Sequence, residues 1–201
     1  MMLARDAIRR FLSSHLRMEI HNAALKHAGV LILLFPKDGS LHVLLTRRTE
    51  DVEHHKGQIS FPGGSVDEGD EDIVSTALRE TEEEIGLHRD SIQVLGKFDD
   101  LEVPSGFTIT PIIAFVDALP ALSLNKDEVA EVLLVPLSIF LDKTNERMQQ
   151  MYRMGRMNDV YFYRYGRDEI WGATAAMIRA FLDAMKVAGL LPALDPGTET
   201  S

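Results

Sequence analysis

The chain has 201 residues, with 21 lysines and arginines, 31 aspartates and glutamates, no cysteine and a formal net charge of -10. The length fits one large domain, and a hydrophobic content of 45% is too high for a disordered chain. The lack of cysteine excludes disulfides, thiolate metal sites and a cysteine nucleophile. Net acidity argues against nucleic-acid binding, because phosphate contacts need clustered lysines and arginines.

The negative charge lies in one stretch of the chain. Residues 66–102 contain 13 acidic residues against three basic ones, whereas the other 164 residues carry 18 of each sign. A near-neutral chain therefore carries one 37-residue acidic segment, and that segment needs a physical explanation.

The first 20 residues predict an amphipathic helix. Apolar residues recur at helical spacing among several arginines, a pattern that a transit peptide also shows. We prefer a helix packed on the domain, because Asp6 interrupts the basic pattern.

No apolar run reaches the roughly 18 residues of a membrane span, and the N-terminus lacks a signal peptide's apolar region. We therefore expect a cytoplasmic protein without a membrane partner.

The remaining elements follow from periodicity and from turn residues. Strands are predicted at 28–35, 41–46, 58–61, 92–98, 108–116, 129–135 and 160–165, and helices at 72–85 and 173–187. A further helix is predicted to begin within 136–141. Pro111 marks the strand at 108–116 as an edge strand or a bulged one.

Two segments carry no clear signal for regular structure. The polar, Met-rich stretch at 143–159 is left without an assigned structure, and its part at 147–159 is interpreted as a mobile loop in preference to a cover over a substrate arm; 191–201 is interpreted as a flexible tail. The chain shows no internal repeat and no linker, so a single domain over 1–201 is expected. Strands and helices alternate without a regular βαβ repeat. This favours an α+β fold with a mixed sheet flanked by helices.

The helix at 72–85 is the most informative part of the chain. On a wheel of about 100° per residue, Glu80, Glu83 and Glu84 share one face. A second side, made of Val74, Leu78, Thr81 and Ile85, forms the predicted buried stripe. Like charges three and four residues apart destabilise a helix, so the acidic face does not serve to stabilise it. It suits Mg²⁺, which takes oxygen ligands and keeps waters and substrate phosphates in its shell.

A solvated acidic helix face is the alternative, and three features of the context argue against it. Arg79 can reach Glu83 one turn later and orient its carboxylate. The pair Gly63-Gly64 lies one loop upstream, where backbone can approach a ligand closely. Gly86 ends the helix directly after the acidic residues.

The same residues resemble a known family. Arg79-Glu80-x-x-Glu83-Glu84-x-Gly86-Leu87 matches the core of the Nudix box, the loop-helix metal site of Nudix hydrolases, here within 62–87. Counting back from Arg79 places the outlying glutamate of the box at Glu71 and its glycine at Ser65. The nearest glycine is Gly64, so the loop is one residue longer than in the box.

Flanking segments resemble the coenzyme A diphosphatase branch of this family. They are Leu44-Leu45-Thr46-Arg47-Arg48, His55-Lys56-Gly57-Gln58, Asn125-x-x-Glu128-Val129-x-Glu131 and Ile170-Trp171-Gly172-Ala173-Thr174. Two positions depart from that branch. Glu53 stands where the branch has an arginine, and Thr49 where it has serine or alanine.

The resemblance implies a Nudix-like α/β/α sandwich and divalent-metal-dependent hydrolysis of a diphosphate. The substrate would be coenzyme A or a derivative, giving 3′,5′-ADP and (acyl-)4′-phosphopantetheine. Another nucleoside diphosphate derivative and a non-catalytic binding module remain alternatives. The expected cofactor is Mg²⁺ or Mn²⁺, and the expected assembly is a monomer or homodimer.

Residue roles are carried over by the same resemblance. Metal ligands are Glu80, Glu83 and Glu84, and the catalytic set is Glu80, Glu83 and Arg79. Arg47, Arg48, Lys56, Gly63 and Gly64 are the candidate substrate-binding residues, and solvent-exposed surface cations are the alternative interpretation of the first three. The general base stays open: Glu80, Glu128 and Glu131 are candidates, and Glu71 is a further ligand or water-orienting candidate. Trp171 either stacks on a base or packs at the start of the last helix.

Overall fold

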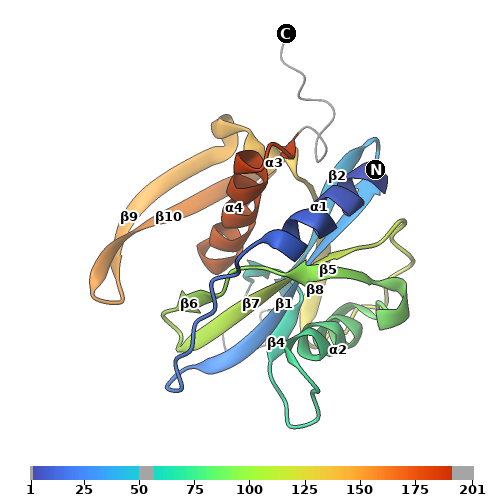
Figure 1. Cartoon of the computed structure of the whole chain (residues 1–201), viewed down its shortest axis with the longest axis horizontal. Helices are drawn as coiled ribbons and strands as arrows, with labels where there is room; N and C mark the ends of the chain where they lie inside the picture. Colours follow the sequence, from blue (N-terminus) through green and yellow to red (C-terminus); the bar gives the residue numbers. More distant parts are fainter. Residues whose placement is uncertain (1, 50–56, 192–201) are drawn as a thin grey trace.

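The computed structural model describes residues 2–49 and 57–191, and it shows two β-sheets with helices packed around them (Figure 1). The larger sheet contains β1 (Lys26–Lys37), β2 (Ser40–Arg48), β3 (Ile59–Ser60), β4 (Gly63–Ser65), β5 (Gln93–Lys97), β6 (Leu101–Val103), β7 (Phe107–Phe115) and β8 (Val129–Pro136). The smaller sheet contains β9 (Glu146–Arg153), β10 (Arg156–Tyr165) and β11 (Asp168–Trp171). The helices are α1 (Met2–Ser14), α2 (Ile73–Ile85), α3 (Ser138–Leu141) and α4 (Gly172–Val187), with short 3-10 turns η1 (Arg89–Ser91) and η2 (Lys143–Asn145).

The larger sheet is mixed, as the sequence predicts. Its order is β3-β2-β1-β7-β5, with β8 also on β2, β4 also on β1 and β6 also on β7. Strands β1 and β7 run parallel, and the other pairs are antiparallel. The turn between the first two strands lies at Asp38-Gly39, both with positive φ. The α+β class with a mixed sheet flanked by helices is confirmed.

Strand β1 is buried on both faces, which explains its nearly continuous apolar sequence. Leu31, Leu33 and Phe35 belong to the core beneath α2. The alternate residues Ile32 and Leu34 belong to the larger core that α1 and α4 cover. Because successive strand residues point to opposite faces, this one strand divides the molecule into two packed layers, one on each side of the sheet (Figure 1).

Pro111 lies in an interior strand, so the edge-strand interpretation is wrong. Strand β7 pairs with β1 on one side and with β5 and β6 on the other. The carbonyl of Pro111 accepts the N–H of Phe98 at 2.9 Å, in the gap between β5 and β6. The missing proline N–H therefore falls where the neighbouring ladder is already interrupted. A bulge does occur nearby, but it lies in β5 between Val94 and Gly96.

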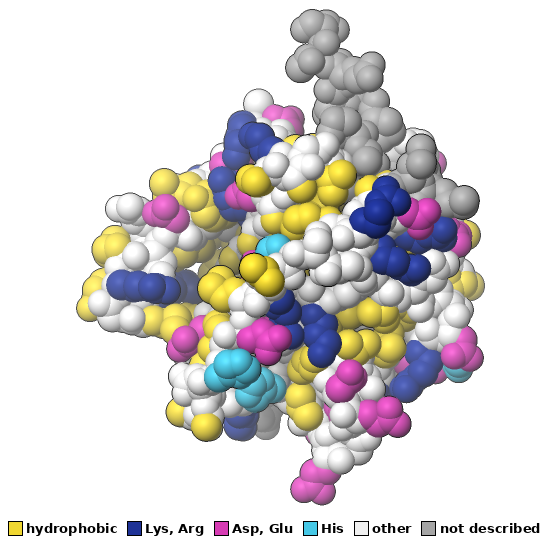
Figure 2. All heavy atoms as spheres, viewed as in Figure 1, with side chains coloured by type: hydrophobic (Ala, Val, Ile, Leu, Met, Phe, Trp, Pro, Cys, Tyr) yellow, Lys and Arg dark blue, Asp and Glu magenta, His cyan; other side chains and the backbone are white. Residues whose placement is uncertain are grey.

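The Met-rich segment is a β-hairpin, and the mobile-loop interpretation is wrong. Strands β9 and β10 pair along their length up to Arg153 and Arg156. The two residues between them, Met154 and Gly155, both have positive φ, as a tight two-residue hairpin turn requires. This arm projects from the body (Figure 1), and Figure 2 shows apolar side chains along it. Exposed apolar residues on it include Met148, Tyr152 and Met157.

The N-terminal helix packs on the domain as expected, but it ends at Ser14 rather than near residue 20. Ala4, Ile8 and Leu12 are buried in the larger core. The hydroxyl of Ser14 donates to the carbonyl of Phe11 at 3.0 Å, a local bond that competes with the helical ladder. None of the helices in the described ranges is long and apolar enough to cross a membrane. The predicted tail at 191–201 lies outside the described residues except for Leu191.

We expect Gly29→Ala to destabilise the protein. A Cβ at this position would lie 2.6 Å from the carbonyl oxygen of Ile73, so α2 would have to move away from β1. Overpacking of this kind costs about 1–3 kcal/mol. Thermal melting checks the effect, with Gly69→Ala as the control because no atom lies within 4 Å of its added Cβ. Equal melting temperatures for the two variants would contradict this account of helix docking.

Candidate active site

Helix α2 has the ends that its sequence predicts. The carboxylate of Asp72 accepts the N–H groups of Val74 and Ser75 at 3.0 and 2.9 Å, which satisfies the free donors of the first turn. Gly86 ends the helix in the left-handed conformation, with φ 67°. The chain direction after the acidic residues is therefore fixed by a residue that tolerates this backbone geometry.

The three acidic residues of the shared face differ sharply in exposure. The side chain of Glu83 is 56% exposed, that of Glu80 is 18% exposed, and residue Glu84 is only 4% exposed. The predicted stripe is buried at Thr81 and Ile85 and partly buried at Val74 and Leu78. The wheel therefore identifies the apolar side correctly. It does not predict the burial of Glu84, because strands from elsewhere in the chain cover that residue.

The two glycines before the helix make this burial possible. The N–H of Gly63 lies close enough to the carboxylate of Glu84 to oppose the rise of its pKa. A Cβ on Gly64 would lie 2.4 Å from the carboxyl carbon and one oxygen of Glu80. Both glycines therefore contact the acidic residues of α2, and any larger side chain at position 64 would displace the carboxylate of Glu80.

Burial and mutual repulsion raise the pKa values of two of these acids. Burial raises the pKa of Glu84 to about 8, with added repulsion from Glu80 and Glu128, although the cation of Arg48 and the Gly63 N–H oppose the shift. Burial also raises the pKa of Glu80, against the opposing effect of Arg79. One carboxylate oxygen of Glu84, Oε2, is buried and has no hydrogen-bond partner among the residues that the structure describes. Such a group is costly unless a proton or a cation compensates it.

Two candidate bases, Glu128 just before β8 and Glu131 within it, have different surroundings in the structure. Glu128 lies near enough to Glu80 and Glu84 to raise the pKa of both. Glu131 instead forms an ion pair with Arg47, with Nε and Oε1 2.6 Å apart. Only Glu128 therefore belongs to the acidic cluster.

The two arginines at the end of β2 are separated in the same way. Arg48 acts electrostatically on Glu84, whereas Arg47 pairs with Glu131 and, at 2.8 Å, with Asp168 of β11. The β2–β8 register shifts between these two arginines. Irregularities of this kind redirect side chains beside functional sites. Arg47 therefore joins the two sheets, and Arg48 faces the candidate site.

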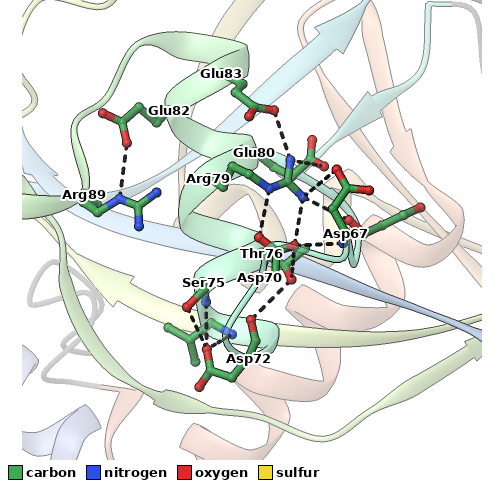
Figure 3. A network of polar contacts seen from close by, with 12 residues as sticks. Asp67, Asp70, Asp72, Ser75, Thr76, Arg79, Glu80, Glu82, Glu83 and Arg89 are labelled. Carbon is green, nitrogen blue, oxygen red and sulfur yellow. Dashed lines mark hydrogen bonds and ion pairs between the residues drawn. The ribbon is translucent and has the colours of Figure 1, made fainter.

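Arg79 organises the polar network that Figure 3 shows. Its Nε and Nη2 bind both oxygens of Asp70 at 2.9 and 3.0 Å, and its Nη1 contacts Glu80 and Glu83 at 3.0 Å each. Its Nη2 also donates to the carbonyl of Ser65 at 3.1 Å. The expected contact with Glu83 is present. The arginine also holds the pKa of Asp70 well below its usual range.

Asp70 is the site residue that the sequence interpretation missed. Counting back from Arg79 selects Glu71, which is exposed in the structure just before the helix cap. Counting six residues forward from Gly64, the same spacing as from Ser65 to Glu71, selects Asp70 instead. The signal was therefore available in the sequence. The bidentate contact of Asp70 with Arg79 places the extra loop residue after Asp70 rather than before it.

The other predicted substrate-binding residues have mixed outcomes. Lys56 and the departing Glu53 lie outside the described residues. Trp171 precedes α4 and stacks on Phe162, with ring centroids 5.7 Å apart. Trp171 therefore packs at the start of the last helix, as a half-buried residue. A cavity of about 510 Å³ lies elsewhere, between the 17–27 segment and the start of α2, and its lining does not include the acidic cluster.

The described residues contain no three carboxylate or imidazole groups already gathered into a metal-binding arrangement. The donor chemistry nevertheless fits a hard cation. The cluster supplies carboxylate oxygens from Glu80, Glu83 and Glu84, with Glu128 beside them. Within 2–49 and 57–191, Oε2 of Glu84 has no hydrogen-bond partner. Oxygen ligands of this type are those that Mg²⁺ prefers, and carboxylates also suit Mn²⁺.

Comparison with known proteins assigns the fold and the box to one class. The NUDIX domain model matches residues 25–154. A relative called uncharacterized Nudix hydrolase NudL, from Photorhabdus laumondii, is 38% identical over 162 residues, covering 81% of this chain and 86% of the relative. The protein of that name from Pectobacterium atrosepticum is 39% identical over 136 residues, covering 68% of this chain and 71% of the relative.

A solved structure shows the same architecture. A MutT/nudix family protein from Enterococcus faecalis matches with a TM-score of 0.50 at 16% identity, covering 94% of this chain and 79% of the other. The family model and the NudL relatives assign the chain to a class of hydrolases that act on diphosphate-containing substrates, at acid anhydride bonds of phosphorus. The chain belongs to the Nudix hydrolase family.

We expect Asp70→Asn to reduce hydrolysis about 10–100-fold, the usual effect of losing a residue that orients a ligand carboxylate. The asparagine would lose the charge that fixes Arg79 and, through it, Glu80. Steady-state kinetics with any cleaved diphosphate checks the effect. Glu71→Gln is the matched comparison, because its side chain is exposed beside Asp70. A larger loss in Glu71→Gln than in Asp70→Asn would reverse the assignment.

We expect the metal-free protein to lose stability relative to Glu84→Gln as pH rises. The folded-state pKa of Glu84, about 8, lies above the ordinary value of 4.5. The folded state therefore holds this proton more tightly. The stabilisation of the folded state by this proton is complete below about pH 4.5 and is lost as pH rises through about 8.

Melting temperatures measured in EDTA from pH 5 to pH 9 check this sign. The advantage of Glu84→Gln over the wild type should grow with pH, while exposed Glu68→Gln should show no such trend. A difference between Glu84→Gln and wild type that stays constant over this range would exclude a raised pKa.

Proposed function

We propose that the protein hydrolyses the diphosphate linkage of coenzyme A or its derivatives with Mg²⁺ or Mn²⁺ as cofactor. The products would be 3′,5′-ADP and (acyl-)4′-phosphopantetheine. The observation that carries the proposed chemistry is the convergence of Glu80, Glu84 and Glu128 beside Gly63 and Gly64. Flanking segments that resemble the coenzyme A branch support the choice of substrate.

The charges of the cluster explain why a cation is needed. A diphosphate and this carboxylate cluster are both anionic, so they repel each other without a divalent cation between them. Glu80, Glu83 and Glu84 would hold the cation through their oxygens. When bound, such a cation neutralises phosphate oxygens and increases the acidity of a coordinated water.

The roles of the remaining groups follow from their positions. Arg79 orients Glu80 and Glu83 by direct hydrogen bonds, and Asp70 fixes Arg79. Arg48, which faces Glu84, is the described cation best placed to contact a phosphate. Glu128 would accept the proton of the water that attacks phosphorus, as the bridging phosphorus–oxygen bond breaks and the bridging oxygen leaves with the other product.

Another nucleoside diphosphate derivative is the second candidate substrate. One observation favours it: Glu53 places an acidic residue where the coenzyme A branch has an arginine. Loss of a cation from a segment expected to meet phosphates would weaken recognition of the additional 3′-phosphate of coenzyme A. This change would leave the hydrolytic chemistry at α2 intact.

We expect release of 3′,5′-ADP and 4′-phosphopantetheine from coenzyme A with Mg²⁺ or Mn²⁺, and none with excess EDTA. Chromatography with mass detection measures both products, alongside nucleoside diphosphate sugars and dinucleotides as competing substrates. Cleavage of another diphosphate while coenzyme A stays intact would exclude the first substrate. Glu53→Arg then tests the departure, because improved turnover of coenzyme A would assign the substrate difference to that residue.

Glu83→Gln and Glu84→Gln test the cation site in the same assay. Removing one ligand charge should lower the rate at least about 100-fold, since both the cation and its orientation are affected. Exposed Glu68→Gln, in the loop before α2, serves as the control for the loss of one negative charge. Full activity in either ligand variant would contradict the proposed ligand set.

A further inference from the structure

The turn before β8 is attached directly to the end of α2 that carries the acidic residues. The N–H of Asn125 donates to the carbonyl of Glu84 at 2.9 Å, and the N–H of Ser123 donates to that of Ile85 at 2.9 Å. These bonds satisfy carbonyls that a helix end leaves without partners. The position of the turn is therefore set by the same residue, Glu84, whose side chain lies in the cluster.

Asn125 also shapes the turn that contains Glu128. Its carbonyl accepts the N–H groups of Glu128 and Val129 at 3.1 and 2.8 Å. Its side-chain Oδ1 accepts the N–H of Asp127 at 3.2 Å. A backbone N–H can only donate, so this bond determines which end of the amide is the oxygen. The Nδ2 group must then face the other way.

The Nδ2 group of Asn125 donates to Oε1 of Glu128 at 3.4 Å. Among the described residues, this amide is the one side-chain hydrogen-bond donor to the carboxylate of Glu128. The contact matters because Glu80 and Glu84 lie close enough to repel that carboxylate. A neutral donor can hold Glu128 in place without adding a cation that would compete with a bound metal ion.

Thr49 secures the other side of the same turn. Its N–H donates to the carbonyl of Glu128 at 2.9 Å, and its hydroxyl donates to the carbonyl of Asp127 at 3.0 Å. Thr49 directly follows Arg48, which faces Glu84. The turn is therefore fixed from α2 by Asn125 and from β2 by Thr49.

We propose that Asn125 is a positioning residue for the hydrolytic reaction, and that Thr49 completes its effect. Asn125 holds the carboxylate of Glu128 toward Glu80 and Glu84, and Thr49 prevents the turn from withdrawing. This inference rests on the proposed role of Glu128 in diphosphate hydrolysis. It also explains Thr49 chemically, because a serine could make the same hydroxyl bond and an alanine could not.

Asn125→Asp provides the sharpest test. The aspartate has the same shape and keeps the oxygen that accepts the N–H of Asp127, but it replaces the donor to Glu128 with a repelling oxygen. We expect kcat to fall at least about 10-fold, KM to change less than about twofold, and the melting temperature to stay close to that of the wild type. Asn22→Asp is the matched control, because Asn22 makes the same turn bond, to the N–H of Ala24, in an exposed segment.

A double-mutant cycle with Glu128→Gln distinguishes positioning from general damage. In the double variant, the glutamine amide at position 128 can donate to the aspartate at position 125. Asn125→Asp should therefore lower kcat less than about twofold when Glu128→Gln is already present. The same fold loss in both backgrounds would overturn the proposal, because Asn125 would then act independently of Glu128. An unchanged kcat in the single variant would overturn it as well.

Thr49 variants keep the proposal testable if Asn125→Asp does not fold. Thr49→Ser should retain activity within about twofold, and Thr49→Ala should lose at least about fivefold in kcat. Wild-type activity in Thr49→Ala would contradict the proposed role of Thr49 in holding the turn. These measurements use any diphosphate that the wild-type protein cleaves. If the wild type cleaves another diphosphate but not coenzyme A, the proposed substrate is refuted. The role of Asn125 is then tested with the diphosphate that is cleaved.

Discussion

The close approach of α2 to the central sheet is the constraint that positions every part of the site. Gly29 lies beneath the first turn of the helix, where a side chain would collide with the carbonyl of Ile73. Gly63 and Gly64 bring backbone against the carboxylates of Glu84 and Glu80. A hydrophobic core beneath the helix maintains this contact. Because the glycines have no side chains, the apolar packing of α2 on the sheet also buries Glu84 and most of Glu80.

The cost of this burial is offset within the structure by a few specific contacts. Arg79 lies between Asp70 on one side and Glu80 and Glu83 on the other. Arg48 and the N–H of Gly63 partly compensate Glu84, whose oxygen Oε2 has no hydrogen-bond partner in the described part of the chain. A cluster with incomplete compensation is an electrostatic arrangement that favours a proton or a divalent cation. Such clusters are more often functional than stabilising.

The segments after β8 link the site to the smaller sheet. Arg47, adjacent to Arg48, pairs with Glu131 of β8 and Asp168 of β11. The hydroxyl of Thr174 in α4 donates to the carbonyl of Ile59 at 3.1 Å, just before the two glycines. Contacts on both sides of the site therefore depend on how the smaller sheet and α4 pack. This arrangement gives the C-terminal third of the chain a role in holding the strands that carry the site.

The amino-acid sequence alone is sufficient for the elements whose signals are local. Helix α2 has a capping residue and a terminal glycine, and its acidic face and apolar side follow from helical periodicity. Strand β1 is recognisable as buried because its apolar run is continuous. The spacing of the box identified the family correctly. Two local signals were present but misinterpreted: the turn at Met154-Gly155, and the spacing that leads from Gly64 to Asp70.

Which charged residues act together depends on tertiary packing. Arg47 and Arg48 are neighbours in sequence, as Glu128 and Glu131 nearly are, yet one member of each pair faces the acidic cluster and the other joins strands. A register shift between β2 and β8 makes that difference, and it arises from pairing between distant segments. The burial of Glu84 and the interior position of Pro111 have the same origin. Helical and strand periods are properties of a short segment, whereas the partner that covers a side chain is set by the packing of the whole chain.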